Sequence, residues 1–311
     1  MWKPIEFMYD AISEDLGRPM TLLRMIDEHP DMRVQVAEPE PVIAADRVAQ
    51  WHNWGDQSSG HWPRRKHCTL LGWRHSAGNY SSFELHRPEL ENFGRCEVLD
   101  MWNCDIQDVT GLSFSKSELH KFTSLDSMVE TNSREMIDAI TEEKLHENLA
   151  HDGMRILNRE GTSDYFARYL WDGRIFLIND GGSHHFAAAR YIASRIKRPV
   201  PLLGKLLTYS INPQAVNALR RDFDVYAMSD DAAITNGFFD SMRMFRATFL
   251  WQYLPRPYDH ARAIFLPKNE PRSMRVSSAL REAGMFDIGE HLTKLTNRQI
   301  AARATPIGSH L

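Results

Sequence analysis

The chain has 311 residues, 42% of them hydrophobic and 25% charged, which is ordinary for a soluble globular protein and allows two domains or one large one. Its formal net charge is −4, whereas a dedicated non-specific DNA-binding protein usually carries a basic excess, so the charge argues against nucleic acid as the main partner. No apolar run approaches the roughly 20 residues of a membrane helix, and the first residues lack an apolar signal core. We therefore expect a cytoplasmic protein with no membrane partner.

The first third of the chain differs in composition from the rest, because six of the eight tryptophans precede residue 103. Apolar spacing predicts a short amphipathic helix over 41–54. A loop is expected over 53–63, and short strands over 68–73 and 80–85. We expect residues 1–130 to form an N-terminal extension or lobe of unknown role. Its tryptophans would either form a partner surface or fill a small core.

The central segment, 131–210, begins with helix-forming chemistry. Asn132 with Glu135 three residues later is typical of a capping box, which predicts a helix over 132–150. Strands are expected over 155–157, 165–169, 174–179 and 200–207, with a hairpin turn at 171–173.

The C-terminal segment, 211–311, is predicted to be mainly helical. Helices are expected to open at Asn212-Pro213 and after residues 229–231. Four prolines make 251–271 irregular apart from a strand over 261–266, and residues 297–311 are expected to form a frayed or docked tail. Together the three segments predict an α+β fold.

The most informative stretch runs from Asp180 to Arg190, with the sequence DGGSHHFAAAR, and we call it the glycine box. It lies between a strand-like segment, 173–179, and a helix-like one, 186–196. Gly181 and Gly182 allow a sharp turn and a close backbone approach to a ligand. A helix that starts there directs its free N–H groups and positive dipole end at the turn, which makes an anion site, most often for phosphate. The alternative is a glycine turn that merely connects strand to helix.

The glycine box also resembles a known family. Residues 181–188 are similar to the Gly-Gly-Cys-His-Arg-Tyr-x-Ala signature of sulfiredoxin and, more broadly, to the Asp-Gly-x-His-Arg box of the ParB/sulfiredoxin-like superfamily. The similarity in element order covers 132–209, about a quarter of the chain. It implies a central α/β domain over 131–210 that binds ATP or another NTP with Mg²⁺ and cleaves it or transfers its phosphoryl group.

The resemblance assigns roles to particular residues. His184 matches the phosphate-contacting histidine of the family, and Asp180 stands near the position of a magnesium-binding acidic residue, although it is as readily a capping residue. The candidate catalytic residues are Asp180, Ser183 and His184. The candidate nucleotide-binding residues are Gly181, Gly182, Ser183, His184, His185 and Arg190.

Two departures from the family pattern change the expected chemistry. Ser183 replaces the nucleophilic cysteine, and because a hydroxyl cannot perform thiol exchange, sulfinic acid reductase activity is not expected. His185 replaces an arginine that would grip phosphate with a charged fork, so affinity would be weaker unless Arg190 compensates.

Two other functions remain open from the sequence. ParB proteins carry a helix-turn-helix domain after the box, and the helical C-terminal third would permit one here, so the chain would then be a ParB-like DNA-binding protein or nuclease. A local basic patch, such as the run at 63–67 that follows Trp62, would contact the DNA. It would be a non-enzymatic interaction protein if the glycine box is degenerate. His61, His67, Cys68 and His75 match no structural zinc spacing, and the three cysteines suggest no disulfide framework. Nucleophile-elbow, phosphate-loop and dinucleotide fingerprints are absent, and the oligomeric state is not predicted.

Overall fold

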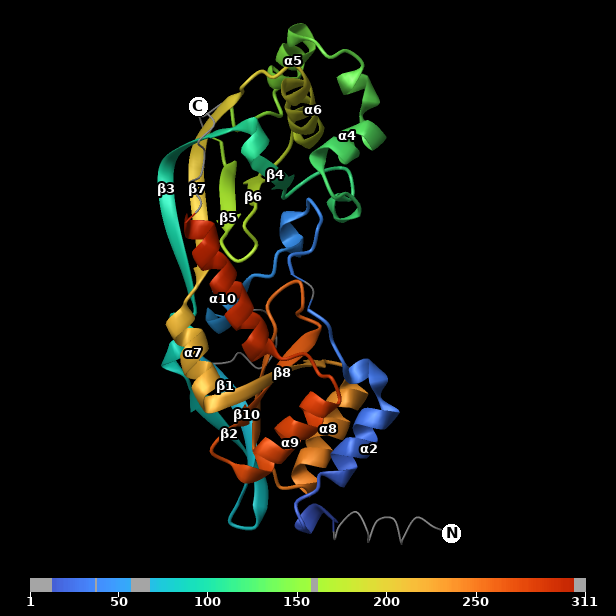
Figure 1. Cartoon of the computed structure of the whole chain (residues 1–311), viewed down its shortest axis with the longest axis vertical. Coiled ribbons are helices and arrows are strands. Elements are labelled where there is room, and N and C mark those ends of the chain that lie inside the picture. Colours follow the sequence, from blue (N-terminus) through green and yellow to red (C-terminus); the bar gives the residue numbers. More distant parts are fainter. Residues whose placement is uncertain (1–12, 37, 57–67, 158–161, 305–311) are drawn as a thin grey trace. The chain divides into compact units, whose positions relative to one another are not determined.

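A computed structural model describes residues 13–36, 38–56, 68–157 and 162–304 (Figure 1). The fold is α+β, as expected, with two five-stranded sheets. The chain forms two compact units. The first unit comprises Met1–Ala37, Gln50–Gly94 and Asn212–Lys294, and the second Glu38–Ala49, Arg95–Ile211 and Leu295–Leu311.

These units divide the chain differently from the expected segments 1–130, 131–210 and 211–311. The reason is strand pairing over long sequence separations. Residues 71–73 of the first third pair with residues 249–251 of the last third, so both segments belong to one sheet.

The first unit is built on an antiparallel sheet with the strand order β2-β1-β9-β10-β8. The β1–β2 hairpin turns at Ala77 and Gly78, which both have positive φ, and it confirms the two strands expected in this region. The strands are β1 (Thr69–Ser76), β2 (Asn79–His86), β8 (Phe223–Ser229), β9 (Phe249–Tyr253) and β10 (Ala261–Pro267).

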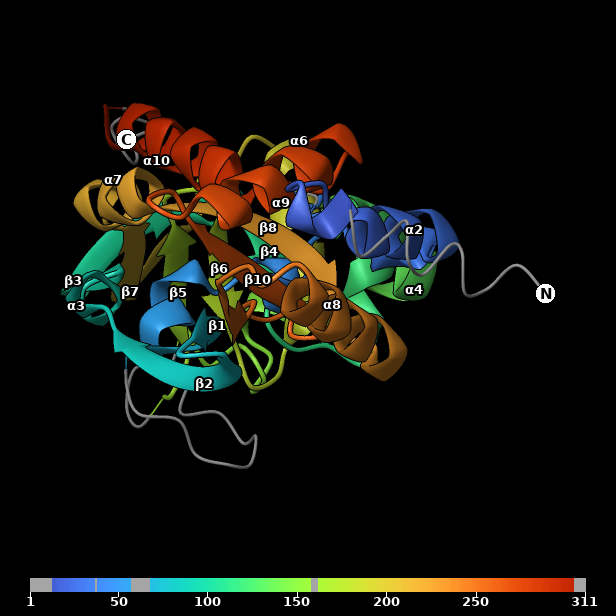
Figure 2. The same ribbon diagram turned by 90° about the horizontal axis from the view of Figure 1, so that it is seen from below.

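Helices cover one face of this sheet. Figures 1 and 2 show α2, α8 and α9 gathered beside the strands, and their apolar side chains form one buried cluster with those of β8 and β10. Asn212 caps α7 and Asp231 caps α8, as the sequence predicts. The helices of this unit are α2 (Met20–Glu28), α3 (Pro88–Glu91), α7 (Pro213–Asp222), α8 (Ala232–Met244) and α9 (Pro271–Glu282), with 3-10 turns η1 (Pro30–Met32) and η3 (Trp51–Asp56).

The opposite face of the first sheet is covered in part by η3. Trp51 and Trp54 are fully buried, and Trp54 stacks on Phe265 with ring centroids 5.9 Å apart. The indole of Trp54 donates to the carbonyl of Tyr253. Trp51 and Trp54 therefore fill a core rather than form an exposed partner surface.

The second unit contains a mixed sheet with the strand order β3-β7-β5-β6-β4. The β5–β6 hairpin is antiparallel, and its turn at Asp172 and Gly173 confirms the expected hairpin. β4 runs parallel to β6, and β5 runs parallel to β7. The strands are β3 (Gly94–Asp105), β4 (Val109–Leu112), β5 (Tyr165–Tyr169), β6 (Ile175–Ile178) and β7 (Pro201–Ile211).

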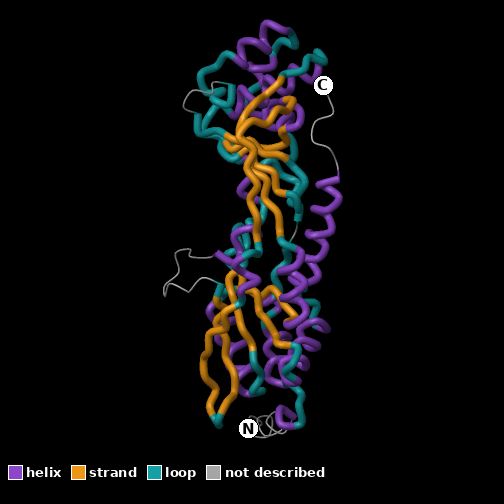
Figure 3. Tube along the Cα trace, turned by 90° about the vertical axis from the view of Figure 1, so that its left-hand side faces the viewer, coloured by secondary structure: helices purple, strands orange, loops and turns teal. Residues whose placement is uncertain are grey.

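The helices α4, α5 and α6 pack together over this sheet (Figures 1 and 3). Alanines at 187–189 and 193 of α6 are fully buried, and these small side chains let the neighbouring helices approach closely. The helices are α4 (Leu125–Asn132), α5 (Glu142–Leu149) and α6 (Ser183–Arg195), with 3-10 turns η2 (Ala45–Arg47), η4 (Ile106–Asp108), η5 (Leu119–Lys121) and η6 (Arg134–Ile137). The last helix, α10 (Ile288–Ala304), contributes residues to both units.

Three predicted elements are wrong. The helix over 41–54 does not form, because the backbone of Ile43 bonds to Phe122 and Leu112 and Ala44 forms a bridge with Leu112. The single helix over 132–150 is divided, because α4 ends at Asn132 and α5 begins only after Thr141, whose hydroxyl caps it. Residues 155–157 form turns rather than a strand.

The C-terminal segment is mainly helical, as predicted, with α7, α8, α9 and α10. It also contains β8 and β9, which were not expected, and β10, which confirms the strand expected over 261–266. Trp62, His61, His67 and the basic run 63–67 lie outside the described residues, as do 305–311 of the expected tail. Within the described ranges, no helix combines the length and apolar character needed to cross a bilayer.

Candidate functional site

The glycine box forms the expected strand–turn–helix. β6 ends at Ile178, and α6 begins at Ser183, three residues earlier than predicted. Gly181 has φ 155° and Gly182 has φ 67°, a left-handed conformation that favours glycine. The turn therefore depends on both glycines.

A close backbone neighbour adds a second reason for glycine at 182. A Cβ on Gly182 would overlap the carbonyl oxygen of Gly153 and also lie 3.1 Å from the amide nitrogen of Met154. Because the obstacle is backbone, a larger residue at 182 would have to displace the 151–154 turn.

The first turn of α6 carries backbone donors that have no acceptor. No side chain caps the helix, and the first amide that bonds within it is that of Phe186, which donates to Gly182. The amides of Ser183, His184 and His185 have no acceptor among the described residues. Gly181, Gly182 and the two histidines are half-exposed, so these donors lie at a surface that an anion can reach.

His184 is held between two serines. Its Nδ1 lies 2.7 Å from Oγ of Ser133, and its Nε2 lies 2.9 Å from Oγ of Ser117. Asn132 donates to the Ser117 oxygen, which favours Ser117 as the donor to Nε2 and therefore a proton on Nδ1. Burial lowers the pKa of His184, so the ring is neutral near pH 7.

His185 is held by a second histidine. Its ring stacks on that of His151 with centroids 3.6 Å apart and 14° between the planes. Nδ1 of His185 lies 3.1 Å from Oδ1 of Asn148. Burial, followed by the nearby His151 and His184, lowers the pKa of His185, so it also is neutral near pH 7. Binding of an anion would favour the protonated forms of both rings.

Residues 113–117, which we call the serine loop, form one wall of the site and were missed from the sequence. The side chain of Asn179 accepts from the amide of Phe114 at 3.2 Å and donates to its carbonyl at 3.0 Å. Ser183 donates to Oγ of Ser115 at 2.9 Å. Alternating serines are typical of a loop, but nothing in the sequence shows that this loop meets the glycine box some 65 residues later in the chain.

The two candidate catalytic side chains other than His184 are already engaged. Ser183 is 7% exposed, and the hydrogen bond of its hydroxyl is to Ser115. Asp180 is exposed and accepts from Arg155 at 2.8 Å, while its amide donates to Asp164. No group of three or more metal-ligating side chains occurs in the described ranges, so a magnesium ion at Asp180 would take most of its ligands from elsewhere.

The structure does not bring Arg190 to the turn. Arg190 lies seven positions after Ser183 in the helix, a rise of about 10 Å. Its guanidinium pairs with Asp126 of α4 at 2.8 Å, where Arg195 also contacts the same carboxylate. Arg190 therefore joins α6 to α4, and the expected compensation for the missing arginine at 185 is not found there.

Comparison with known proteins gives one family. A model described as a family of unknown function (DUF6685) matches residues 99–305, which is more than half of the chain and includes the glycine box. Searches of curated proteins and of solved structures found no match.

Proposed function

The chain belongs to the DUF6685 family, and we propose that its second unit binds the phosphate group of a nucleotide at the N-terminus of α6. The observation that carries the proposal is the uncapped start of this helix. Three consecutive amides without an acceptor follow a glycine turn at a half-exposed surface. A phosphate would satisfy these donors and interact favourably with the helix dipole.

The serine loop supports a nucleotide over inorganic phosphate. Phe114 is 53% exposed, while its backbone is fixed to Asn179 at the start of the turn. An exposed aromatic ring beside a phosphate site is a stacking surface for a base, worth about 1–3 kcal/mol. Lys116, two residues after Phe114, is exposed and adds a positive charge near His184.

Cleavage or transfer of the phosphate would require more than these contacts. A magnesium ion at Asp180 would have to displace Arg155 and take its other ligands from phosphate oxygens and water. Freed Arg155 would then be available to neutralise charge on the phosphate, which is the main requirement of phosphoryl transfer. Release of inorganic phosphate from ATP is the measurement that would detect this cleavage.

Calorimetric titration of ATP, CTP and GTP, with and without Mg²⁺, tests the binding proposal. The informative pair of variants is His185→Glu and His185→Gln, which both remove the imidazole and differ in one negative charge in the first turn of α6. Glutamate is well tolerated at this helix position, so the fold should be retained. We expect His185→Glu to bind about tenfold more weakly than His185→Gln.

Phe114→Ala distinguishes the contribution of the base to binding from that of the phosphate. It should weaken nucleotide binding about tenfold while pyrophosphate binding stays within twofold of the wild type. Absence of saturable binding by every nucleotide, or equal affinities for the two His185 variants, would overturn the proposal.

A further inference from the structure

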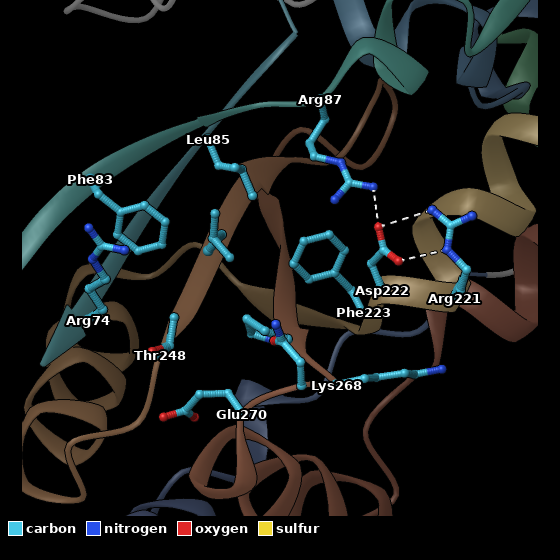
Figure 4. Close-up of a pocket in the computed structure, with 13 residues that line it drawn as sticks. Arg74, Phe83, Leu85, Arg87, Arg221, Asp222, Phe223, Thr248, Lys268 and Glu270 are labelled. Atoms are coloured by element: carbon cyan, nitrogen blue, oxygen red, sulfur yellow. Dashed lines mark hydrogen bonds and ion pairs between the residues drawn. The ribbon is translucent and has the colours of Figure 1, made fainter.

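The first unit contains a pocket of about 770 Å³ that the proposed function does not use (Figure 4). This volume falls in the range of small-molecule sites. We call it the arginine pocket, and its lining residues are Arg74, Phe83, Leu85, Arg87, Arg221, Asp222, Phe223, Thr248, Leu250, Pro267, Lys268, Asn269 and Glu270.

The floor of the arginine pocket is apolar and belongs to the sheet. Phe83 of β2, Gly72 of β1 and Leu250 of β9 are direct partners across the strands, so they share one face. A Cβ on Gly72 would lie 2.7 Å from side-chain atoms of both Phe83 and Leu250. Because Gly72 has no side chain, the phenyl ring of Phe83 packs against the sheet there. The ring then forms a flat apolar floor of the pocket.

One end of the pocket is a closed set of ion pairs. Asp222 accepts from Arg87 at 2.7 Å and from Arg221 at 2.9 Å, as the dashed lines in Figure 4 mark. Hydrogen bonds from Arg221 and then Arg87 lower the pKa of Asp222, so this carboxylate is charged at neutral pH. Lys268 pairs with Asp224 at 3.2 Å. The charges at this end are thus neutralised within the protein.

Arg74, at the other end, is different. Its guanidinium lies 4.8 Å from the centroid of the Phe83 ring (Figure 4). Among the described residues it makes no hydrogen bond and no ion pair with a carboxylate. The carboxylate on the same side of the pocket, Glu270, is engaged in capping α9 through the amide and hydroxyl of Ser273. An unneutralised guanidinium thus lies beside the half-buried ring of Phe83.

We propose that the arginine pocket binds a small ligand with a flat apolar or aromatic body and one anionic group, a carboxylate or a phosphate. The body lies over Phe83 and Leu250, and the anion pairs with Arg74. Arginine suits this role because its planar fork binds either anion with two hydrogen bonds while it stacks on a ring. The lining carries four cations and two carboxylates, which also favours an anionic ligand.

The test uses three probes with one ring system, 2-naphthoate, 2-naphthyl phosphate and neutral 2-naphthol, titrated calorimetrically into the full chain. We expect saturable binding in which the affinity for at least one anion is about tenfold above that for naphthol. The stronger of the two anions identifies the head group. Absence of saturable binding by both anions, or equal affinity for naphthol, would overturn the proposal.

Variants locate the probe. Arg74→Met should weaken binding of the preferred anion about tenfold and leave naphthol binding within twofold, whereas Phe83→Leu should weaken all three probes. Arg221→Met is the matched control, because it removes an equal charge from the same lining. If Arg221→Met weakens the anion as much as Arg74→Met does, the anion is not held by Arg74 and the assignment is wrong. Arg74 is exposed, so circular dichroism should report an unchanged fold for its variant.

Discussion

The two candidate sites are made in different ways. The glycine box presents backbone amides in one short segment, and its donors depend on the conformation of Gly181 and Gly182. The arginine pocket presents side chains from strands that are about 170 residues apart in sequence, such as Phe83 of β2 and Leu250 of β9. A site built from local backbone leaves a motif in the sequence, whereas a site assembled from distant side chains leaves none. We therefore expect substitutions at the glycine box to change the free energy of unfolding more than substitutions at the arginine pocket do.

The largest change in the free energy of unfolding is expected at Gly182, where only glycine fits the backbone conformation. Gly182→Ala should lower the free energy of unfolding by about 3 kcal/mol or more, because the new Cβ adds overlap with Gly153 to the cost of a left-handed residue. Gly173→Ala is the matched control in the same unit, since its φ is 88° but nothing lies within 4 Å of the new Cβ. It should cost only about 1–2 kcal/mol. Urea denaturation of both variants checks the difference, and equal losses would show that the Gly153 contact does not matter.

The next effect concerns the asparagine that joins the serine loop to the glycine box. Asn179 is buried and its side chain bonds to Ser113, Phe114 and Gly181. Asn179→Ala leaves several of these groups unsatisfied, so we expect a loss of about 2–3 kcal/mol in unfolding free energy and weaker nucleotide binding. Asn269→Ala in the arginine pocket, where the side chain is exposed and makes no hydrogen bond to a described residue, should be nearly neutral. A loss below about 0.5 kcal/mol for Asn179→Ala would contradict a stabilising role of these hydrogen bonds.

A smaller effect is expected at the closed end of the arginine pocket. Arg87 is the better buried of the two arginines at Asp222, and its guanidinium also lies 5.0 Å from the centroid of Phe223. A double-mutant cycle of Arg87→Met and Asp222→Asn should give a coupling energy of about 1 kcal/mol. The same cycle with Arg221→Met should give less, because Arg221 is exposed and screened by solvent. A coupling for Arg221 equal to that of Arg87 would show that burial does not set the strength of this cluster.

Local signals explain which parts of the fold were predictable. The β5–β6 hairpin follows from apolar segments around a glycine turn, and β1 and β2 were expected as two short strands. The caps Asn212 and Asp231 mark their helices directly. The prediction of a helix over 41–54 was wrong because the backbone partners of Ile43, Leu112 and Phe122, are remote in sequence. The prediction of one helix over 132–150 was wrong because Thr141, and not Asn132, caps the helix α5.

The same division applies to the candidate sites. The turn at Gly181 and Gly182 and the helix after it were predictable, because glycine conformation and the free amides of a helix start are local properties. The hydrogen bonds that hold His184 were not predictable, since Ser117 and Ser133 lie 67 and 51 residues away in the sequence. The distance of Arg190 from the turn depends on the helix starting at Ser183 rather than Phe186, which the sequence did not indicate.

The smallest expected effect is a pH dependence that separates the two sites. Burial lowers the pKa of His184 and His185, so both are neutral in the free protein near pH 7. A bound anion favours their protonated forms and raises these pKa values, so lowering the pH from 8 to 6 should tighten binding severalfold with uptake of protons. Inorganic sulfate, whose charge is constant over this range, is the suitable probe for the glycine box, with calorimetry in buffers of different ionisation enthalpy to count the protons. The lining of the arginine pocket contains no histidine among the described residues, so naphthoate binding should not change over the same range. Because arginine stays charged throughout, a naphthoate affinity that rose in parallel with that of sulfate would mean that both anions bind at the histidines of the second unit.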